Sequence, residues 1–339
     1  PNLGMEFRPY YVTKGWVKLG HEVLIVGGSY SHLRKVQPQS CEEMIDDMRY
    51  RWVKVNPYKG NGIGRIISMF SFVTKLYCNY RRYLRNFKPD IVIASSTYPL
   101  DIYPAYRIAR HYHAKLIYEV HDLWPLSPME LGGYSKKHPF IRIMQKAEDD
   151  CYRYADAVVS MLPKAEEHMR EHGLTRDKFH YVPNGIVLSD WNNPKGIPEE
   201  HGLLLSKLRA EGKFIVGFAG AHGIANSLYA VIDAVSSLTE QNVVLVLVGG
   251  GQEKENLIKY AHKKGVTNVY FLLPINKLAI PNLLKEMDVL YIGLQKQSLF
   301  RFGISPNKMF DYMMAAKPII QAIDAGNNLV READCGIDV

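Results

Sequence analysis

The stretch Val243-Val-Leu-Val-Leu-Val248, followed directly by Gly249-Gly-Gly251, decides the fold class of this 339-residue chain. A continuous apolar run that ends at glycines is typical of a strand buried on both faces, as strands of parallel sheets are. Apolar, β-branched runs of this kind alternate with helical patterns along the chain, which indicates right-handed βαβ units. We therefore predict an α/β protein with parallel sheets, whose strands lie at residues 21–28, 50–56, 89–96, 114–122, 155–162, 178–183, 213–220, 242–249, 268–274, 287–294, 317–323 and 335–339.

Residues 183–198 separate two sets of predicted strands. They contain Asn184-Gly185, Asn192-Asn-Pro194 and Gly196-Ile-Pro198, which are typical of turns and linkers. We predict Rossmann-like domains with doubly wound parallel sheets on either side, and a cleft between them. The predicted boundaries are residues 1–186 for the N-terminal domain, 187–198 for the linker and 199–339 for the C-terminal domain.

Composition favours two globular domains over other classes. Hydrophobic residues make up 47% of the chain and charged residues 22%, which argues against disorder. No uncharged apolar run of about 18 residues is present, so no membrane-spanning helix is expected. The four cysteines lie far apart without a C-x-x-C pair, which favours a reduced, cytoplasmic protein. Because the chain begins at Pro1, it is interpreted as a fragment.

The net charge of +8 is concentrated in one stretch. Residues 48–89 contain ten Lys or Arg and no Asp or Glu. Apolar residues recur there every three or four positions, which predicts a helix with one face on a sheet. The outward basic residues of segment 64–88 would attract an anionic membrane surface, although a solvated basic face explains them equally. Nucleic acid is not expected as a partner, because no known binding module is recognisable.

Glu119-Val-His121-Asp122 closes a predicted strand with an ionisable cluster. Carboxyl ends of parallel strands are where ligands bind in open sheets. His121 there could act on a reacting group or stabilise developing positive charge, so we predict Glu119, His121 and Asp122 as catalytic residues. A strand-end histidine paired with Asp122 for structural reasons is the alternative.

A second candidate site follows strands of the C-terminal half. Ser305-Pro-Asn307-Lys308 precedes a predicted helix over 308–316, whose N-terminus would bind an anion. Lys308 and Arg301 would neutralise a diphosphate, and Asp311 would accept from ribose hydroxyls. Small residues near other strand ends would let backbone approach a phosphate. The predicted binding residues of this group are Gly220, His222, Gly223, Gly250, Arg301, Ser305, Asn307, Lys308 and Asp311.

One pattern resembles a metal site. His168-Met-Arg-Glu171-His172 has the spacing of inverted zinc proteases, and the two histidines would share a helix face. Gly173 ends that helix at once, and a zinc site needs a third ligand from a supporting element. Histidines in a last helical turn are also favoured by the helix dipole. We therefore predict no metal ligands.

Taken together, the ordered motifs resemble family 4 retaining glycosyltransferases of the GT-B fold, in particular the WbuB-like branch of O-antigen and capsule enzymes. The resemblance spans the whole chain and rests on Gly4-Met-Glu-Phe-Arg8-Pro, Gly20-His-Glu-Val, Lys88-Pro-Asp-Ile-Val, Glu119-Val-His-Asp-Leu-Trp-Pro, Pro183-Asn-Gly-Ile, Gly249-Gly-Gly and Ser305-Pro-Asn-Lys-Met-Phe-Asp-Tyr-Met. Against this family, the first strand and the closing C-terminal helix are expected to be missing. The resemblance adds Gly4 and Arg8 to the binding residues.

The family implies transfer of a sugar from a nucleotide-sugar donor with retained configuration and without a metal cofactor. It implies a UDP-sugar carrying an N-acetylated or deoxy hexose, and a polyprenyl-diphosphate-linked saccharide as acceptor. The protein would then work in the cytoplasm, on the inner face of the plasma membrane. The family resemblance places His121 beside the reacting sugar and Asp311 on the ribose.

Two departures from the family pattern stand out. The Arg and Lys that relatives carry after the first C-terminal strand are absent from residues 220–226, so Lys308, with Arg301 and His222, is expected to supply the charge. Gly303 replaces the first acid of an E-x7-E pair that ends at Asp311. A UDP-N-acetylhexosamine 2-epimerase of similar architecture and a non-catalytic nucleotide-sugar-binding protein remain open as alternatives.

Overall fold

The computed structural model describes residues 7–34, 36–60 and 62–339. Unit 1 comprises the described residues up to Met161 together with Ala165–Val182, and unit 2 comprises Leu162–Lys164 and Pro183–Val339. Both units contain parallel sheets flanked by helices, as the alternating sequence pattern predicts.

Unit 1 contains two sheets. One is fully parallel, in the order β4-β5-β6-β7. The other has the order β1-β3-β2. The strands are β1 (Leu24–Gly28), β2 (Glu42–Ile45), β3 (Met48–Val53), β4 (Ile91–Ala94), β5 (Lys115–Val120), β6 (Ala157–Ser160) and β7 (Phe179–Tyr181). The helices are α1 (Phe7–Lys18), α2 (Ile63–Tyr83), α3 (Ile102–Tyr112), α4 (Leu126–Gly132), α5 (Pro139–Tyr154) and α6 (Glu166–Glu171), with 3-10 turns η1 (Pro99–Asp101) and η2 (Arg176–Lys178).

Strand β2 corrects the prediction of purely parallel sheets, because it pairs antiparallel with β3. Its sequence, Glu-Glu-Met-Ile, has no apolar run, and alternate residues are exposed. Asp46 and Asp47 join the two strands, and both have positive φ, at 49° and 64°. Two such residues in sequence form the primed turn that suits a two-residue hairpin.

Unit 2 is built on one six-stranded parallel sheet in the order β10-β9-β8-β11-β12-β13. The strands are β8 (Phe214–Ala219), β9 (Val243–Val248), β10 (Val269–Leu272), β11 (Val289–Gly293), β12 (Ile319–Ala322) and β13 (Gly336–Asp338). The helices are α7 (Leu188–Asn192), α8 (Glu199–Ala210), α9 (Leu228–Ser236), α10 (Lys254–Lys263), α11 (Ile280–Lys285), α12 (Asn307–Met314) and α13 (Leu329–Glu332), with 3-10 turns η3 (Ile224–Asn226), η4 (Thr239–Gln241), η5 (Lys277–Ala279) and η6 (Ser298–Phe302). Counted within the unit, the strand order is 3-2-1-4-5-6, the order of the Rossmann fold.

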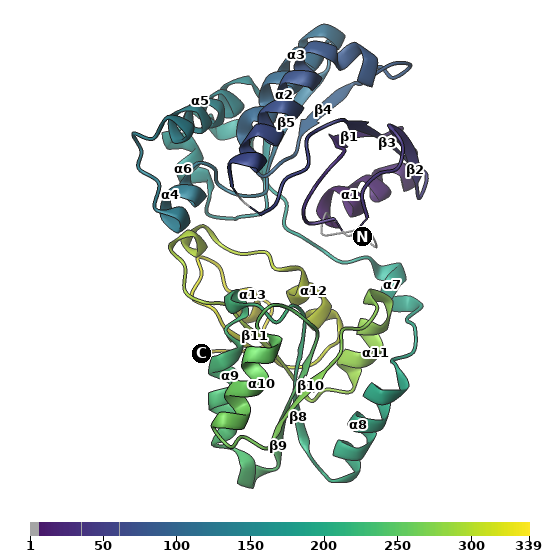
Figure 1. Cartoon of the computed structure of the whole chain (residues 1–339), viewed down its shortest axis with the longest axis vertical. Helices are drawn as coiled ribbons and strands as arrows, with labels where there is room; N and C mark the ends of the chain where they lie inside the picture. Colours follow the sequence, from purple (N-terminus) through teal and green to yellow (C-terminus); the bar gives the residue numbers. More distant parts are fainter. Residues whose placement is uncertain (1–6, 35, 61) are drawn as a thin grey trace. The chain divides into compact units, whose positions relative to one another are not determined.

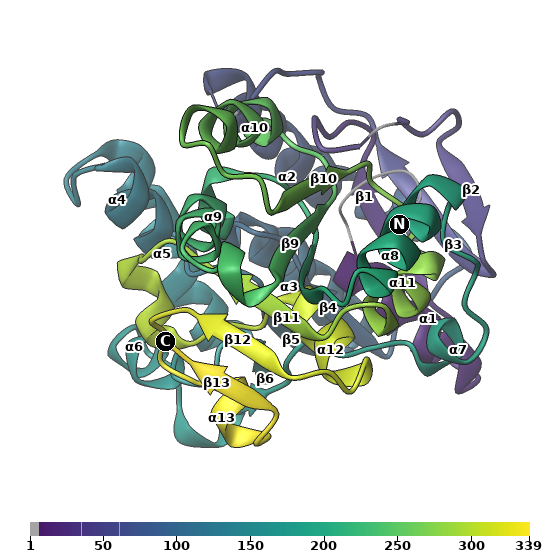
Figure 2. The same ribbon diagram turned by 90° about the horizontal axis from the view of Figure 1, so that it is seen from below.

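Strand β9 shows why this unit is stable. Val244, Val246 and Val248 point into a core cluster shared with α8, α11 and α12. The alternating residues Leu245 and Leu247 point into a second cluster shared with α9 and α10. Figure 1 shows α9 and α10 on one face of this sheet and α8 and α11 on the other, and Figure 2 shows the same layering from below. Burial on both faces is what the run of six apolar residues predicts.

Two helices of unit 1 form its outer layer. α2 packs against α3, and both contact η1; α2 also contacts β3, and α3 contacts β4 and β5. The buried residues of α2 include Met69, Val73, Leu76 and Tyr80, which are members of the predicted apolar stripe. The predicted helical periodicity of this basic segment is therefore confirmed.

Candidate functional site

The strand order of unit 2 reverses between β8 and β11, and the loops that follow these strands carry the predicted binding residues. Ligands of doubly wound sheets bind at this switch point, outside the carboxyl ends of the strands. Gly220 N donates to Val248 O at 3.0 Å and His222 N donates to Gly250 O at 2.8 Å. These bonds hold the loop after β8 against the glycines after β9.

Glycine is required where these two loops meet. A Cβ on Gly249, whose φ is +151°, would lie 1.9 Å from Gly220 O. A Cβ on Gly251 would lie 2.4 Å from His222 O. Only a residue without a side chain permits such close backbone contact. Gly223 caps η3 on the same loop and has open space around it.

Lys308 lies in the first turn of α12 and reaches toward this loop. A Cβ on Gly220 would lie 3.4 Å from Lys308 Nζ. The ammonium group donates to the side-chain oxygen of Asn226 and lies 4.5 Å from the ring centroid of Phe218. Burial lowers the pKa of Lys308 to about 8. Within the described part of the chain this cation has no carboxylate partner.

His222 is fully buried between the same loops, and neither ring nitrogen has a hydrogen-bond partner among the described residues. Burial, together with the charges of Lys254 and Lys308, lowers the pKa of His222 to about 4. The imidazole of the unliganded chain is therefore neutral at neutral pH, which does not support the expectation that His222 supplies positive charge.

Asp311 and Ser305 lie at opposite ends of the motif around α12. Asp311, which is 7% exposed, forms an ion pair with Lys277 and accepts from Trp191 Nε1 at 3.4 Å. Ser305 Oγ accepts from Asn184 N at 2.8 Å, and Asn184 Nδ2 donates to Ser305 O at 2.6 Å. The Pro183-Asn-Gly and Ser305-Pro-Asn motifs are thus joined by paired hydrogen bonds within unit 2.

Arg301 and Gly303 occupy the η6 segment that precedes α12. Arg301 is exposed, donates to Ser298 O at 2.7 Å and lies 4.3 Å from the Phe302 ring centroid. It lines an open cavity of about 410 Å³ together with Lys164, Lys296, Gln297, Ser298, Asp324, Ala325 and Gly326, a set that does not include Lys308. Gly303 has φ +102°, and a Cβ there would lie 2.5 Å from Pro163 Cδ. The acid expected from the family pattern cannot be accommodated at this position.

Unit 1 carries the second group of predicted residues, at the ends of β4 and β5. His121 Nε2 lies 2.9 Å from Ser95 Oγ and 3.2 Å from Glu119 Oε2. Ser95 Oγ donates to Glu119 Oε2 at 2.5 Å, and Arg8 Nε donates to Glu119 Oε1 at 2.9 Å. Arg8 also donates to Val182 O at 2.9 Å. Gly4, predicted beside Arg8, lies outside the described residues.

These contacts fix the ionisation of the cluster. Burial opposes charge on Glu119, but hydrogen bonding and charge from His121, with Ser95 and Arg8, outweigh it and lower the pKa of Glu119 to about 2. An ionised carboxylate only accepts hydrogen bonds, and the one hydroxyl proton of Ser95 points to Glu119. His121 Nε2 must therefore carry a proton and donate it to both neighbours, which leaves Nδ1 for other contacts.

Asp122 does not pair with His121. Its carboxylate accepts from Ser127 Oγ and from Trp124 Nε1, the latter at 3.2 Å. Asp122 thus orders the loop that leads into α4, and the structural alternative for His121, a pair with Asp122, is wrong. Asp101 is buried and interacts electrostatically with His121, and burial raises its pKa to about 7.

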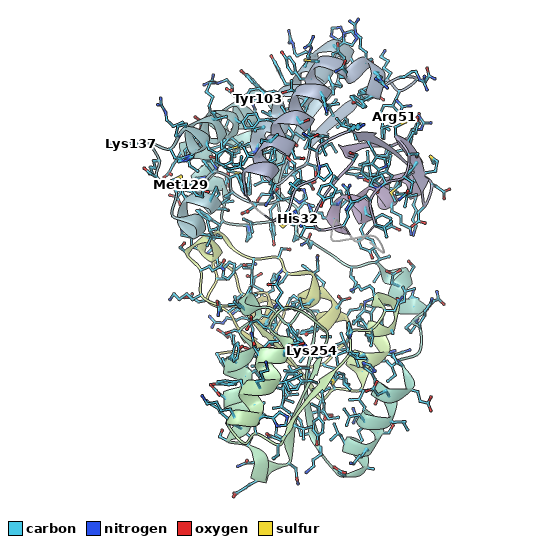
Figure 3. All side chains as sticks on the ribbon, in the orientation of Figure 1. His32, Arg51, Tyr103, Met129, Lys137 and Lys254 are labelled. Atoms are coloured by element: carbon cyan, nitrogen blue, oxygen red, sulfur yellow. The ribbon has the colours of Figure 1, made fainter. Side chains whose placement is uncertain are left out.

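Several polar groups of these two sites are not among the residues predicted from the sequence. Ser95 directly follows β4, the strand beside β5, so the contact between Ser95 and Glu119 follows from the strand order. Lys254, labelled in Figure 3, starts α10 and donates to Gly249 O at 2.9 Å and Leu272 O at 2.6 Å. A lysine five residues after a strand-end glycine was an available signal for this contact. The partner of Asp311, Lys277, had no such signal, because only the tertiary fold brings it close.

Comparison with known proteins identifies the family. Residues 4–185 match the glycosyl transferase 4-like domain, and residues 205–327 match the glycosyl transferases group 1 domain. The chain belongs to the glycosyl transferase 4-like family. It is 24% identical over 215 residues to a protein of Bacillus subtilis strain 168 named "Putative teichuronic acid biosynthesis glycosyltransferase TuaH". That match covers 61% of this chain and 50% of TuaH, so the chain spans half the length of this relative.

Solved structures of low sequence identity share the fold. The glycosyltransferase WaaG, which is involved in lipopolysaccharide biosynthesis, is 17% identical, with a TM-score of 0.64 over 99% of this chain and 83% of WaaG. Anabaena HepE, solved in complex with UDP-glucose, is 18% identical, with a TM-score of 0.55 over 83% of this chain and 69% of HepE. A sucrose-phosphate synthase from Thermosynechococcus elongatus is 13% identical, with a TM-score of 0.67 over 100% of this chain and 82% of that protein. The glycosyl transferase 4-like chain therefore has the GT-B fold.

Proposed function

We propose that this protein is a retaining glycosyltransferase that transfers a hexose from a UDP-sugar to a saccharide acceptor. The observation that carries the proposal is Lys308, a half-buried ammonium at the first turn of α12 without a carboxylate partner in the described chain. Lys308 lies at the switch point of the unit 2 sheet, where a bound diphosphate would neutralise its positive charge. HepE, of the same fold, is solved with UDP-glucose, which supports UDP as the nucleotide.

The proposal gives the groups of unit 2 distinct tasks. Lys308 and the backbone N–H groups that open α12 stabilise the leaving diphosphate. Asp311 accepts hydrogen bonds from the ribose hydroxyls. To do so, its carboxylate has to leave the ion pair with Lys277 or be shared between Lys277 and the ribose. We assign His121 of unit 1 to the reacting sugar, as the family resemblance implies. Stabilisation by fixed cations needs no divalent metal, so we propose a metal-independent reaction.

The acceptor that we propose is a polyprenyl-diphosphate-linked saccharide of surface-polysaccharide synthesis, as in the WbuB-like branch. The names of TuaH and WaaG, which refer to teichuronic acid and lipopolysaccharide, support this class of pathway. Such an acceptor is reached at a membrane surface. None of the described helices has the length and apolarity needed to cross a bilayer.

The α2 surface of unit 1 is our candidate for membrane contact. We define it as Lys75, Arg81, Arg82, Arg85 and Lys88, all exposed. Exposed Ile63, Ile67 and Tyr77 lie on the same helix, and Arg107 of α3 lies 4.4 Å from the Tyr77 ring centroid. Arg51, labelled in Figure 3, is not part of this surface, because it is buried and donates to Tyr83 O and Arg85 O at 2.6 and 2.8 Å.

The test of the proposed function is release of UDP from a panel of UDP-sugars, with and without lipid-linked acceptors, after exhaustive chelation. A transferase releases UDP and gives a glycosylated acceptor. An epimerase converts the donor sugar without acceptor, and a binding protein retains UDP without turnover. Loss of all activity on chelation, restored by Mg²⁺ or Mn²⁺, contradicts the metal-independent part of the proposal.

We predict that Lys308→Ala weakens UDP and UDP-sugar binding together. The lost charge-assisted contact is worth about 1.5–3 kcal/mol, or roughly 10- to 150-fold in Kd. Calorimetry on the folded variant measures it, with Lys285→Ala, an exposed lysine of the same unit, as the control. Unchanged UDP affinity in the Lys308 variant rules out this role.

The lowered pKa of Lys308 gives a second readout of the same contact. Only the ammonium form attracts a phosphate, so UDP affinity of the wild type should fall as the pH rises above about 8. Lys308→Arg should remove this fall, since a guanidinium stays protonated. An identical pH profile for wild type and Lys308→Arg assigns the effect to another group.

His121→Ala should act differently, because a group at the reacting carbon matters mainly in the transition state. Turnover should fall by about 10²- to 10⁴-fold while UDP affinity changes little. The matched control is His180→Ala, an exposed histidine on β7 of the same unit. Near-normal sugar transfer by a folded His121 variant would show that this histidine is structural.

We expect the α2 surface to bind anionic vesicles in a salt-dependent manner. The triple variant Arg81→Glu, Arg82→Glu, Arg85→Glu should lose co-sedimentation with such vesicles, since each basic residue near the membrane contributes about 1 kcal/mol. Lys259→Glu, Lys263→Glu, Lys285→Glu reverses as much charge on exposed residues of unit 2 and should bind normally. If the two variants bind equally, the α2 surface is only a solvated face.

A further inference from the structure

Two helices of unit 1 bring metal-binding side chains together outside both candidate sites. Glu148 of α5 meets His168 of α6 and His172 at the end of α6, and one donor atom of each lies within 4.8 Å of the others. His168 Nε2 is 3.2 Å from Glu148 Oε1. The imidazole rings of His168 and His172 have centroids 4.7 Å apart. The sequence pattern lacked a third ligand from another element, and Glu148 supplies it from α5.

A fourth oxygen lies next to this group. Asp149, adjacent to Glu148 on α5, places Oδ1 3.0 Å from His172 Nδ1. Donor atoms around a tetrahedral zinc ion, with bonds of about 2.0–2.2 Å, lie roughly 3.3–3.6 Å apart. The two imidazole–carboxylate distances, 3.2 and 3.0 Å, are close to that separation. The donor atoms of Glu148, His168 and His172 lie within 4.8 Å of one another, so the side chains would have to draw closer around an ion.

Gln145, one turn before Glu148, shows how much acceptor capacity the group has. Its Nε2 lies 2.8 Å from Glu148 Oε2, 2.9 Å from Asp149 Oδ1 and 2.8 Å from His172 Nδ1. An amide NH₂ has two hydrogens and here faces two carboxylate oxygens and an imidazole nitrogen, whose donor or acceptor role depends on the tautomer. The acceptors converge on a point where a cation would satisfy all of them, and rotation of the amide by 180° would present its oxygen as a further ligand.

Burial distinguishes this group from surface acids and histidines. The side chain of Glu148 is 1% exposed and that of His168 is 12% exposed. Tyr152 Oη donates to Glu148 Oε1 at 2.9 Å, and this contact orients the carboxylate as outer hydrogen bonds do in metal sites. His172 and Asp149 are more exposed, at 26% and 39%, which gives an ion a path from solvent.

We propose that Glu148, His168 and His172, with Asp149 or Gln145 as fourth ligand, bind a Zn²⁺ ion. Four ligands of imidazole and carboxylate or amide type suit zinc. Because all four come from the protein, no coordination position is left open, which is typical of a structural rather than a catalytic site. The ion would tie α6 and its C-terminal end to α5. This inference is independent of the proposed sugar transfer, in which none of these residues takes part.

The experiment is zinc titration of the full chain after removal of metals, followed by measurement of bound metal and of Tm. The variant His168→Ala, His172→Ala removes two ligands. Its control, His180→Ala, His262→Ala, removes two exposed histidines outside the cluster. A site of this kind gives one Zn²⁺ per chain in the wild type and the control, with a zinc-dependent rise in Tm. The ligand variant should bind more than about 100-fold more weakly and show no rise, since even an outer partner is worth 10- to 100-fold.

Co²⁺ provides an independent readout, because a tetrahedral site with nitrogen and oxygen ligands gives strong visible absorption. If the double variant does not fold, Glu148→Gln, which keeps the size of the buried side chain and removes its charge, replaces it and should show the same loss. Absence of stoichiometric zinc binding in the wild type overturns the proposal. Equal binding by the wild type and a folded ligand variant overturns it as well.

Discussion

The close approach of two backbone loops in unit 2 is the constraint on which the donor half of the site depends. Gly249 and Gly251 follow β9 with φ values of +151° and +154°, and a Cβ at either would collide with the backbone of residues 220–222. Any larger residue would push the loop after β8 outward. The loop after β8 carries the buried His222 and leads to Asn226. Lys308 reaches from α12 to the side chain of Asn226. The glycines therefore set the position of the one cation that we assign to the diphosphate.

Desolvation explains the electrostatics of this region. The pKa of Lys308 falls to about 8 because its ammonium is half-buried against Phe218 and Gly220, with only a neutral amide to accept from it. Burial and two lysines keep His222 neutral. A bound anion would offset the unfavourable desolvation of the Lys308 ammonium and raise its pKa. Anion binding and protonation of Lys308 therefore favour each other. The backbone N–H groups that open α12 add to the same effect.

The sequence predicted much of this and missed the rest for identifiable reasons. Each predicted strand has a counterpart, and the clearest sequence patterns are the apolar runs buried on both faces, as in Val243–Val248. β2 was missed because half of its residues are exposed and its sequence is acidic. The absent acid at Gly303 was noticed, but its cause, a positive φ beside Pro163, is visible only in three dimensions. Likewise, His168 and His172 were recognised as a pair, while Glu148, buried on a different helix, could not be connected to them from spacing alone.

The ionised cluster of unit 1 also limits how retention of configuration could be achieved in the proposed reaction. A double displacement needs a carboxylate that is free to attack the sugar. Glu119 accepts from Arg8 and Ser95 and from the protonated Nε2 of His121, so both of its oxygens are engaged. Asp122 accepts from Ser127 and Trp124. With a pKa of about 2, Glu119 is also never a proton donor at neutral pH. In the proposed reaction Glu119 would hold the Nε2–H tautomer of His121, and we assign Nδ1, rather than either carboxylate, to the chemistry.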